Sequence, residues 1–182
     1  MFRLFTFVKI CRILFTKWEE FVIIGLKWKK VGESGSMFFG SYEHSLDSKG
    51  RLCVPAKFRE KLSDILYIVK GFDGCIAVFT EQDFAPKINE YLSLSFNHND
   101  TRAHVRINAS TIEETSLDKQ GRLTLSSRLL KKEGIGPEVV IVGVIDHFEI
   151  WDRNAWEKYY EENYARDEEI AENLDARKKD NE

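Results

Sequence analysis

The sequence predicts an α+β protein that is mainly β: a pseudo-symmetric barrel of two similar repeats, with short helices and a C-terminal helix. The first observation is that EHSLDSKGRLCVPAKFR, residues 43–59, returns in edited form as ETSLDKQGRLTLSSR, residues 114–128. The shared residues keep one offset of 71 positions, which indicates two copies of one supersecondary unit. The second observation is that each half has short strand-like runs and too little apolar surface to fold well alone. We therefore expect each repeat to lend strands to the other.

The first repeat is expected to cover residues 37–108. In its turn, Asp47 can bond the backbone two residues on and Gly50 tolerates positive φ, as a tight turn that closes with a bulge requires. Pro55 can open a helix at its first turn. The expected elements are strands at 38–46, 51–54, 66–69 and 75–79, the last two forming a hairpin, and helices at 56–62 and 81–94.

The second repeat, residues 109–153, replays this order. Ser126 can cap a short helix in place of the proline. The expected elements are strands at 109–117, 122–125, 139–144 and 148–151, a turn at 118–121, and a helix at 127–132. Residues 154–182 are expected to form a C-terminal helix that is aromatic at first and ends in a solvated acidic tail.

Residues 1–36 differ in composition from the rest of the chain. Their apolar runs are short or interrupted by cations, whereas a membrane-spanning helix needs about 20 apolar residues. An amphipathic arm on a membrane surface is one interpretation. The interpretation we favour is a non-native or disordered extension, translated from a start codon placed too far upstream of Met37.

Charge and cysteine content narrow the function classes. Residues 37–151 carry 14 basic and 16 acidic groups, so a nucleic-acid contact has to come from a few local cations rather than from a broad basic face. The cysteines are odd in number and lack C-x-x-C spacing, so the sequence indicates neither a disulfide framework nor a zinc site, and it favours a reducing cytoplasm. Cys53 and Cys75 lie in strand-like runs and are expected to be small core residues.

Catalytic motifs are missing from the sequence. The four histidines are scattered without metal-ligand spacing, and neither a phosphate-cradling glycine loop nor a nucleophile elbow occurs. We therefore predict that the chain is not an enzyme and has no metal or cofactor.

The repeated turn is the strongest candidate for a binding site. Lys49 and Arg51 set two cations around Gly50, which lets the backbone approach a partner and present its N–H groups to an anion. The arginine, repeated as Arg122, can fork two donors to a phosphate or to guanine.

A structural interpretation of the same residues stays open. Asp47 and Asp118 are expected to hold the turns rather than to catalyse a reaction. Each arginine could pair internally with its turn aspartate, or with Glu43 and Glu114.

The motifs together resemble a known family. SLDSKGRLCVP with an arginine four positions after the proline, then GFDGC-x-AVF and the second LDKQGRL, closely resemble the MraZ family of bacterial transcriptional regulators, relatives of the AbrB-like swapped-hairpin DNA-binding proteins. The resemblance runs from Met37 to about Trp156. It implies a cytoplasmic, nucleoid-associated autorepressor of the division and cell-wall gene cluster. It further implies a ring-shaped homo-oligomer that binds direct repeats in double-stranded promoter DNA, with no membrane or small-molecule partner.

The resemblance assigns DNA contact to Lys49, Gly50, Arg51, Lys119, Gly121 and Arg122. The second copy departs from the family pattern, because Gln120 replaces the lysine and Lys119 lies one place earlier. We therefore expect the first loop to make the main contact with DNA. A ring that presents several loops would supply by avidity the affinity that a near-neutral chain lacks. The alternatives are an oligomeric protein-interaction or assembly module without specific DNA binding, and an enzyme acting on an anionic substrate at the Lys-Gly-Arg loop.

Residues 1–36, read as DNA, give a further hypothesis. They can encode AAAGTGG three times, starting at nucleotides 48, 78 and 88 from the first codon. The spacings of 30 and 10 nucleotides are close to whole turns of B-DNA. The segment would then be the regulator's own operator, with chance coincidence as the other interpretation because codon choice is free at several positions.

Overall fold

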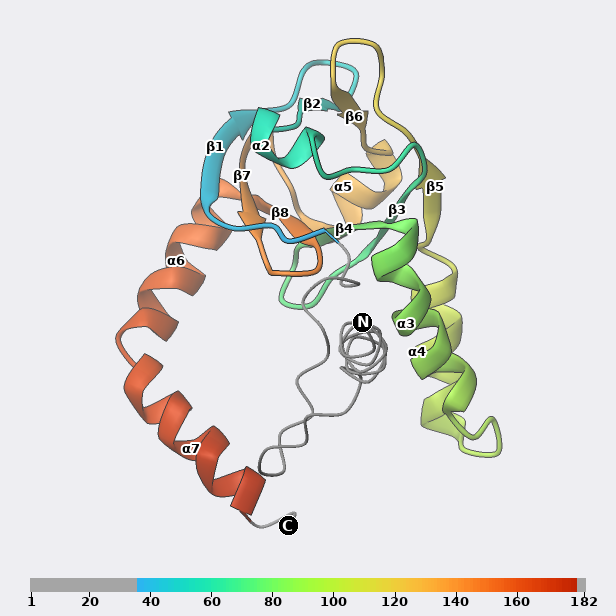
Figure 1. The fold of residues 1–182 in the computed structure, drawn as a ribbon, viewed down its shortest axis with the longest axis vertical. Helices are drawn as coiled ribbons and strands as arrows, with labels where there is room; N and C mark the ends of the chain where they lie inside the picture. The colour runs from blue at the N-terminus through green and yellow to red at the C-terminus, as the bar shows by residue number, and fades with distance from the viewer. Residues whose placement is uncertain (1–35, 180–182) are drawn as a thin grey trace, which may run out of the picture. The chain divides into compact units, whose positions relative to one another are not determined.

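The computed structural model describes residues 36–179, without the side chains of Lys178 and Lys179. The expectations for residues 1–35 lie outside this range. The first repeat contains β1 (Ser41–Ser45), β2 (Arg51–Cys53), α2 (Ala56–Arg59), β3 (Leu66–Lys70), β4 (Ile76–Thr80), α3 (Glu81–Ser93) and α4 (Asn99–Ala109) (Figure 1).

The second repeat runs through the same order of elements. It contains β5 (Glu113–Thr115), β6 (Arg122–Thr124), α5 (Ser127–Glu133), β7 (Glu138–Gly143) and β8 (Phe148–Asp152). The C-terminal helices α6 (Arg153–Tyr164) and α7 (Asp167–Lys179) follow β8 as α3 and α4 follow β4. The predicted cap is confirmed, since the Ser126 hydroxyl accepts a hydrogen bond from the backbone N–H of Leu129 (3.3 Å). Thr80 and Asp152 cap α3 and α6 at corresponding places.

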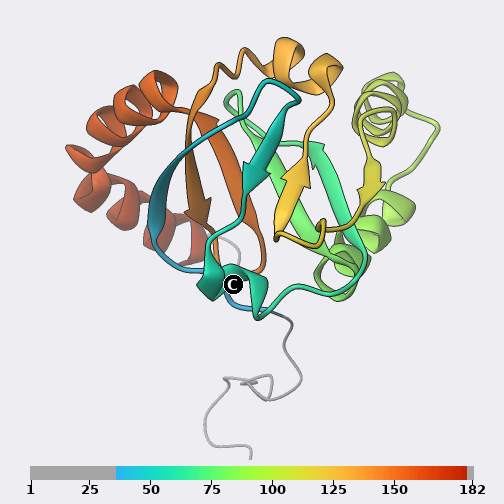
Figure 2. The same ribbon diagram turned by 90° about the horizontal axis from the view of Figure 1, so that it is seen from above.

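The two repeats exchange strands. Six strands form one antiparallel sheet in the order β1-β7-β8-β4-β3-β5, and β2 pairs with β6 separately (Figure 2). Strand β1 of the first repeat pairs with β7 of the second, and β5 of the second pairs with β3 of the first. The α+β class and the lending of strands are thus confirmed. The six-stranded sheet does not close into a barrel, because β1 and β5 remain its two edges.

The core lies between the β2–β6 pair and one face of the large sheet. Leu52 and Leu123, which face each other across β2–β6, are fully buried with Ile76 and Ile150 of the central strands. At one end of this core, Phe38 meets the ring of Phe58 at 5.1 Å and that of Phe148 at 5.5 Å, both edge to face.

The opposite face of the sheet is covered by helices. Phe84 of α3 is buried against Ala77 and Phe79 of β4. On the other half of the sheet, Trp151 of β8 contacts Trp156 (5.5 Å) and Tyr159 (4.9 Å) of α6. Every residue of β4 is buried, because this central strand is covered on both faces.

Two predictions about helices are wrong. The strand expected from residue 109 begins only at Glu113, because α4 extends to Ala109. Sequence periodicity missed α4, since none of its residues is buried and it therefore needs no apolar stripe. The single helix expected at 154–179 is two helices, interrupted at Ala165 and Arg166, where an i to i−3 hydrogen bond tightens the chain.

One of the two predictions about the cysteines is confirmed and the other is wrong. Cys75 is buried, as expected, whereas Cys53 is exposed because it alternates along β2 with the inward-facing Leu52. None of the described helices has both the length and the apolar composition needed to cross a bilayer.

Candidate functional site

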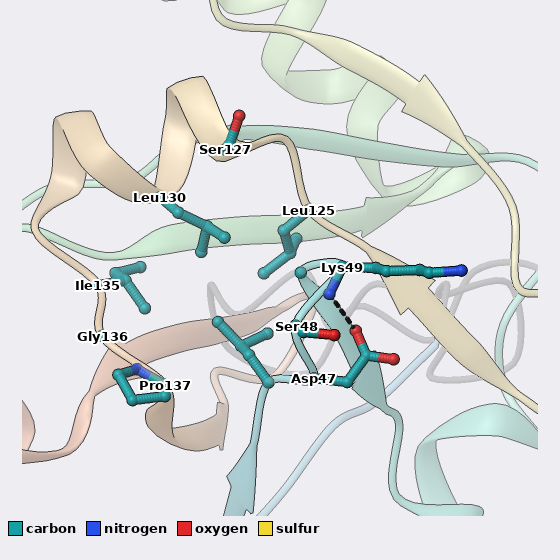
Figure 3. A pocket seen from close by; sticks show the side chains of 11 residues that line it. Asp47, Ser48, Lys49, Leu125, Ser127, Leu130, Ile135, Gly136 and Pro137 are labelled. Carbon is teal, nitrogen blue, oxygen red and sulfur yellow. Dashed lines mark hydrogen bonds between the residues drawn. The ribbon is translucent and has the colours of Figure 1, made fainter.

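Asp47 organises the turn between β1 and β2 (Figure 3). Its Oδ1 atom accepts hydrogen bonds from the backbone N–H groups of Lys49 and Arg51, each 2.9 Å long. The Asp47 carbonyl accepts a third from the N–H of Gly50 (2.9 Å), whose φ is 71°. The aspartate turn and the left-handed glycine expected from the sequence are therefore both present.

The turn between β5 and β6 repeats this geometry. Asp118 Oδ1 accepts from the N–H groups of Gln120 (2.8 Å) and Arg122 (3.0 Å). Gly121 donates to the Asp118 carbonyl (2.9 Å) and has a φ of 73°. The third residue of each turn donates to the aspartate through its backbone N–H and not through its side chain, so the turn keeps its shape with glutamine there. The lysine of the first turn is thus not needed for folding.

Each turn aspartate holds the arginine of its own turn. Nε of Arg51 donates to Asp47 Oδ2 at 2.6 Å, and Nη2 lies 2.6 Å from the same oxygen. The corresponding two distances between Arg122 and Asp118 are 2.7 Å. The Arg51 guanidinium lowers the pKa of Asp47 to about 2, and Arg122 likewise lowers the pKa of Asp118. The internal pairing that the sequence left open is present in both turns.

Pairing leaves part of each guanidinium available. Arginine has five N–H donors, and the contacts with aspartate engage only those on Nε and Nη2. The side chains of Arg51 and Arg122 remain 29% and 27% exposed. The aspartate therefore fixes the orientation of the guanidinium while other donors can meet an external anion. The other partners suggested by the sequence are not used: Glu43 pairs with Arg153 (2.7 Å), and within residues 36–179 Glu114 forms no ion pair.

Lys49 and Lys119 are exposed, and neither forms an ion pair with another residue of the described range. Figure 3 shows the Lys49 side chain extending away from the apolar residues beside the turn. Because the arginine of each turn is matched by an aspartate, the lysine leaves each turn with a net charge of one positive unit.

The two turns are connected through the β2–β6 pair. The N–H of Leu125 donates to the Gly50 carbonyl (2.9 Å), and the N–H of Val54 donates to the Gly121 carbonyl (3.1 Å). Each turn is thus bonded to the strand end of the other repeat. Because β2 and β6 are antiparallel, the turns lie at opposite ends of the pair (Figure 2), on the same side of the large sheet (Figure 1).

The comparisons with known proteins agree with the doubled architecture. A family model described as "MraZ protein, putative antitoxin-like" matches twice, over residues 37–107 and 110–178. The chain belongs to the MraZ family. A relative named transcriptional regulator MraZ from Desulforamulus reducens is 41% identical over 138 residues, which cover 76% of this chain and 97% of the relative.

Further relatives carry the same name. The protein from Moorella thermoacetica is 42% identical over 138 residues, covering 76% of this chain and 96% of the relative. The protein from Mycoplasmoides gallisepticum is 37% identical over 142 residues, covering 76% and 98%. The resemblance to MraZ is confirmed, and the chain is a member of a family of transcriptional regulators and not of an enzyme family. In the described part of the chain no three His, Cys, Asp or Glu side chains are grouped so as to hold a metal ion.

In this MraZ chain the two turn glycines have different neighbours. A methyl group added at Gly50 would lie 2.8 Å from the Leu125 carbonyl oxygen and 3.5 Å from Cδ1 of Leu130. Leu125 and Leu130 line an open hollow of about 380 Å³ beside this turn (Figure 3). A methyl group at Gly121 would instead lie 2.5 Å from both Cδ and Nη1 of Arg59.

Sequence reasoning gave Arg59 no role beyond its place at the end of the motif. The signal that could have found it is the repeat offset itself, because Arg59 and Leu130 are 71 positions apart. The two residues are therefore repeat equivalents, and each covers the turn glycine of the opposite repeat.

Proposed function

We propose that this MraZ-family chain is a sequence-specific DNA-binding regulator that represses its own promoter within the division and cell-wall gene cluster. It would bind direct repeats in double-stranded DNA as a ring-shaped homo-oligomer and associate with the nucleoid in the cytoplasm. In this proposal residues 37–108 and 109–153 are the two repeats, and residues 154–182 are a helical, acidic tail.

The observation that carries the proposal is the matched pair of cationic turns. Each has an arginine oriented by an aspartate and an exposed lysine with no ion pair in residues 36–179. An oriented guanidinium can donate two parallel hydrogen bonds to a phosphate or to the O6 and N7 atoms of guanine. Lysine adds a mobile charge that suits the DNA backbone.

The spacing of the turns fits a DNA groove. Gly50 lies opposite Leu125, and Gly121 lies opposite Val54, so the turns are separated by the four residue steps from Gly50 to Val54. At about 3.3 Å per residue this is about 13 Å. The major groove of B-DNA is about 12 Å wide. The two turns of one chain can therefore approach opposite edges of one groove, and a ring would repeat this contact along the DNA with the gain in affinity that multivalency gives.

The test is binding to the natural DNA that precedes the codon of Met37. We expect Arg51→Ala to abolish the gel shift while the oligomer mass stays unchanged. Arg153→Ala is the matched control, because it also removes the cation of an ion pair and its side chain is similarly exposed at 34%. Tight binding by Arg51→Ala, or equal loss in both variants, would contradict the proposal.

A second candidate function is an oligomeric interaction or assembly module. The observation that favours it is a row of aromatic side chains on α6, where Tyr159, Tyr160 and Tyr164 are 37%, 50% and 71% exposed. Exposed aromatic residues of this kind are enriched at protein interfaces. This module would oligomerise without shifting promoter DNA, so the same gel shift separates the two functions.

A further inference from the structure

The second turn departs from the first at one position that matters for an anion. Gln120 occupies the place of Lys49, and its side chain carries no charge. The cationic side chains that its own repeat provides to the second turn are Lys119, one place earlier, and Arg122, which is paired with Asp118. For this reason the sequence favours the first turn as the main DNA contact.

The neighbours of the turn glycines change this expectation. Arg59, on α2 of the first repeat, lies directly over Gly121, with Cδ and Nη1 2.5 Å from the position of an added methyl group. Its repeat equivalent Leu130 covers Gly50 and carries no charge. The turn that lacks a lysine at its third position is therefore the turn that has an arginine from the other repeat beside its glycine.

Arg59 is available for an external partner. Its residue is exposed, and no ion pair within residues 36–179 involves its side chain. The contrast with Arg51 and Arg122 is direct, because both of these are held by an aspartate. An unpaired guanidinium on an exposed turn can offer its N–H donors to a phosphate oxygen.

We propose that Arg59 is a phosphate-contacting residue of the second turn. It comes from the opposite repeat and takes the part that Lys49 has in the first turn, where the second turn has Gln120. Both turns of one chain then contact the DNA backbone. Besides its paired arginine, the first turn uses one cation, Lys49, and the second uses two, Lys119 and Arg59. This inference rests on the proposed DNA-binding function and assigns the second turn an equal part in it.

Arg59→Leu is the test variant, because it gives the second turn the residue type that covers the first and keeps an apolar cover on Gly121. Lys57→Leu is the matched control, since it makes the same substitution at an exposed cation on the same short helix. Binding is measured by fluorescence anisotropy against the DNA preceding the Met37 codon and against a random duplex of equal length, over a series of salt concentrations.

We expect Arg59→Leu to weaken binding about tenfold, as loss of a hydrogen bond to a charged group does. The slope of log affinity against log salt should fall by about 0.9 for each second turn engaged. Lys57→Leu should change affinity less than about twofold. Adding Gln120→Lys to Arg59→Leu should restore at least half of the lost slope, which a merely structural role of Arg59 would not allow.

Equal affinities for Arg59→Leu and Lys57→Leu, or a failure of Gln120→Lys to restore any binding to a folded double variant, would overturn the inference. If Arg59→Leu does not fold, as judged by its melting temperature, Arg59→Gln replaces it with the same expectations. The outcome for the proposed function is separate. If the wild-type protein binds both duplexes equally, sequence-specific regulation is contradicted. The difference in affinity between Arg59→Leu and Lys57→Leu then still tests whether Arg59 contacts a phosphate. Wild-type protein that binds neither duplex contradicts both.

Discussion

Replacing Gly50 by alanine should destabilise the protein more than replacing Gly121, although the two glycines hold the same place in equivalent turns. Their φ angles, 71° and 73°, both lie in the left-handed region. The backbone penalty for alanine there, about 1–2 kcal/mol, is thus the same at both sites. Alanine also lowers the conformational entropy of the unfolded chain, which offsets about 0.4–1 kcal/mol of that penalty equally at both sites. What differs is the group that the new methyl meets.

At Gly50 the methyl would lie 2.8 Å from the Leu125 carbonyl oxygen, which is backbone. This segment cannot move away cheaply, because the Leu125 N–H is bonded to the Gly50 carbonyl. At Gly121 the three atoms nearest to the methyl all belong to Arg59, an exposed side chain that can rotate. Overpacking against a fixed group costs about 1–3 kcal/mol. We therefore expect Gly50→Ala to lose about 1–3 kcal/mol more stability than Gly121→Ala.

Thermal unfolding at one fixed protein concentration checks this expectation, because oligomerisation would make the melting temperature depend on concentration. For a chain of this length 1 kcal/mol corresponds to about 2–4 °C, so the two variants should differ by about 2–12 °C. Introducing Arg59→Ala should lessen the cost of Gly121→Ala and leave that of Gly50→Ala unchanged. Equal melting temperatures, or a larger loss for Gly121→Ala, would refute the reasoning.

Three further predictions concern the pH response, the thiols and the core. The Asp47 carboxyl should titrate at about 2 in NMR, and at a higher pH in Arg51→Ala, which removes the guanidinium but keeps the two backbone N–H bonds to Oδ1. Since its folded pKa is below the unfolded one, the stabilisation is complete above about pH 4 and is lost as the pH falls through about 2. Under native conditions a thiol reagent should label Cys53 and spare Cys75, which is buried and has a raised pKa, as peptide mapping by mass spectrometry can establish. Phe38→Ala should cost about 3–5 kcal/mol in urea unfolding, because the ring is fully buried between two others; a loss below about 1 kcal/mol would contradict its place in the core.

The parts of the fold that the sequence predicts are those fixed by local chemistry. The two turns depend on an aspartate and a glycine three residues later, and both signals are explicit in the residues. The Ser126 cap is equally local. The exchange of strands could be predicted because a repeat with little apolar surface has to find its core in the other copy.

The missed features depend on tertiary context. Helix α4 has no buried residue, so its position leaves no hydrophobic period in the sequence. The break after α6 lacks the glycine or proline that usually marks one. Arg59 reaches the second turn only through the pairing of β2 with β6, which brings Val54 next to Gly121 across 67 positions of the chain. The sequence supplied the residues of the candidate site, whereas their distribution between the two turns required the structure.

The exchange of strands has a consequence for synthesis on the ribosome. Ser41 of β1 pairs with Val142 of β7, about 100 residues later. At about 5–20 residues per second, β1 therefore waits about 5–20 s for its partner strand to be made. During this interval the first repeat has an unpaired strand edge, which can join a neighbouring nascent chain instead. A nascent chain on the same messenger could thus receive β1 from another copy, so that the spacing of ribosomes, and not only the folded surface, influences how the chains assemble.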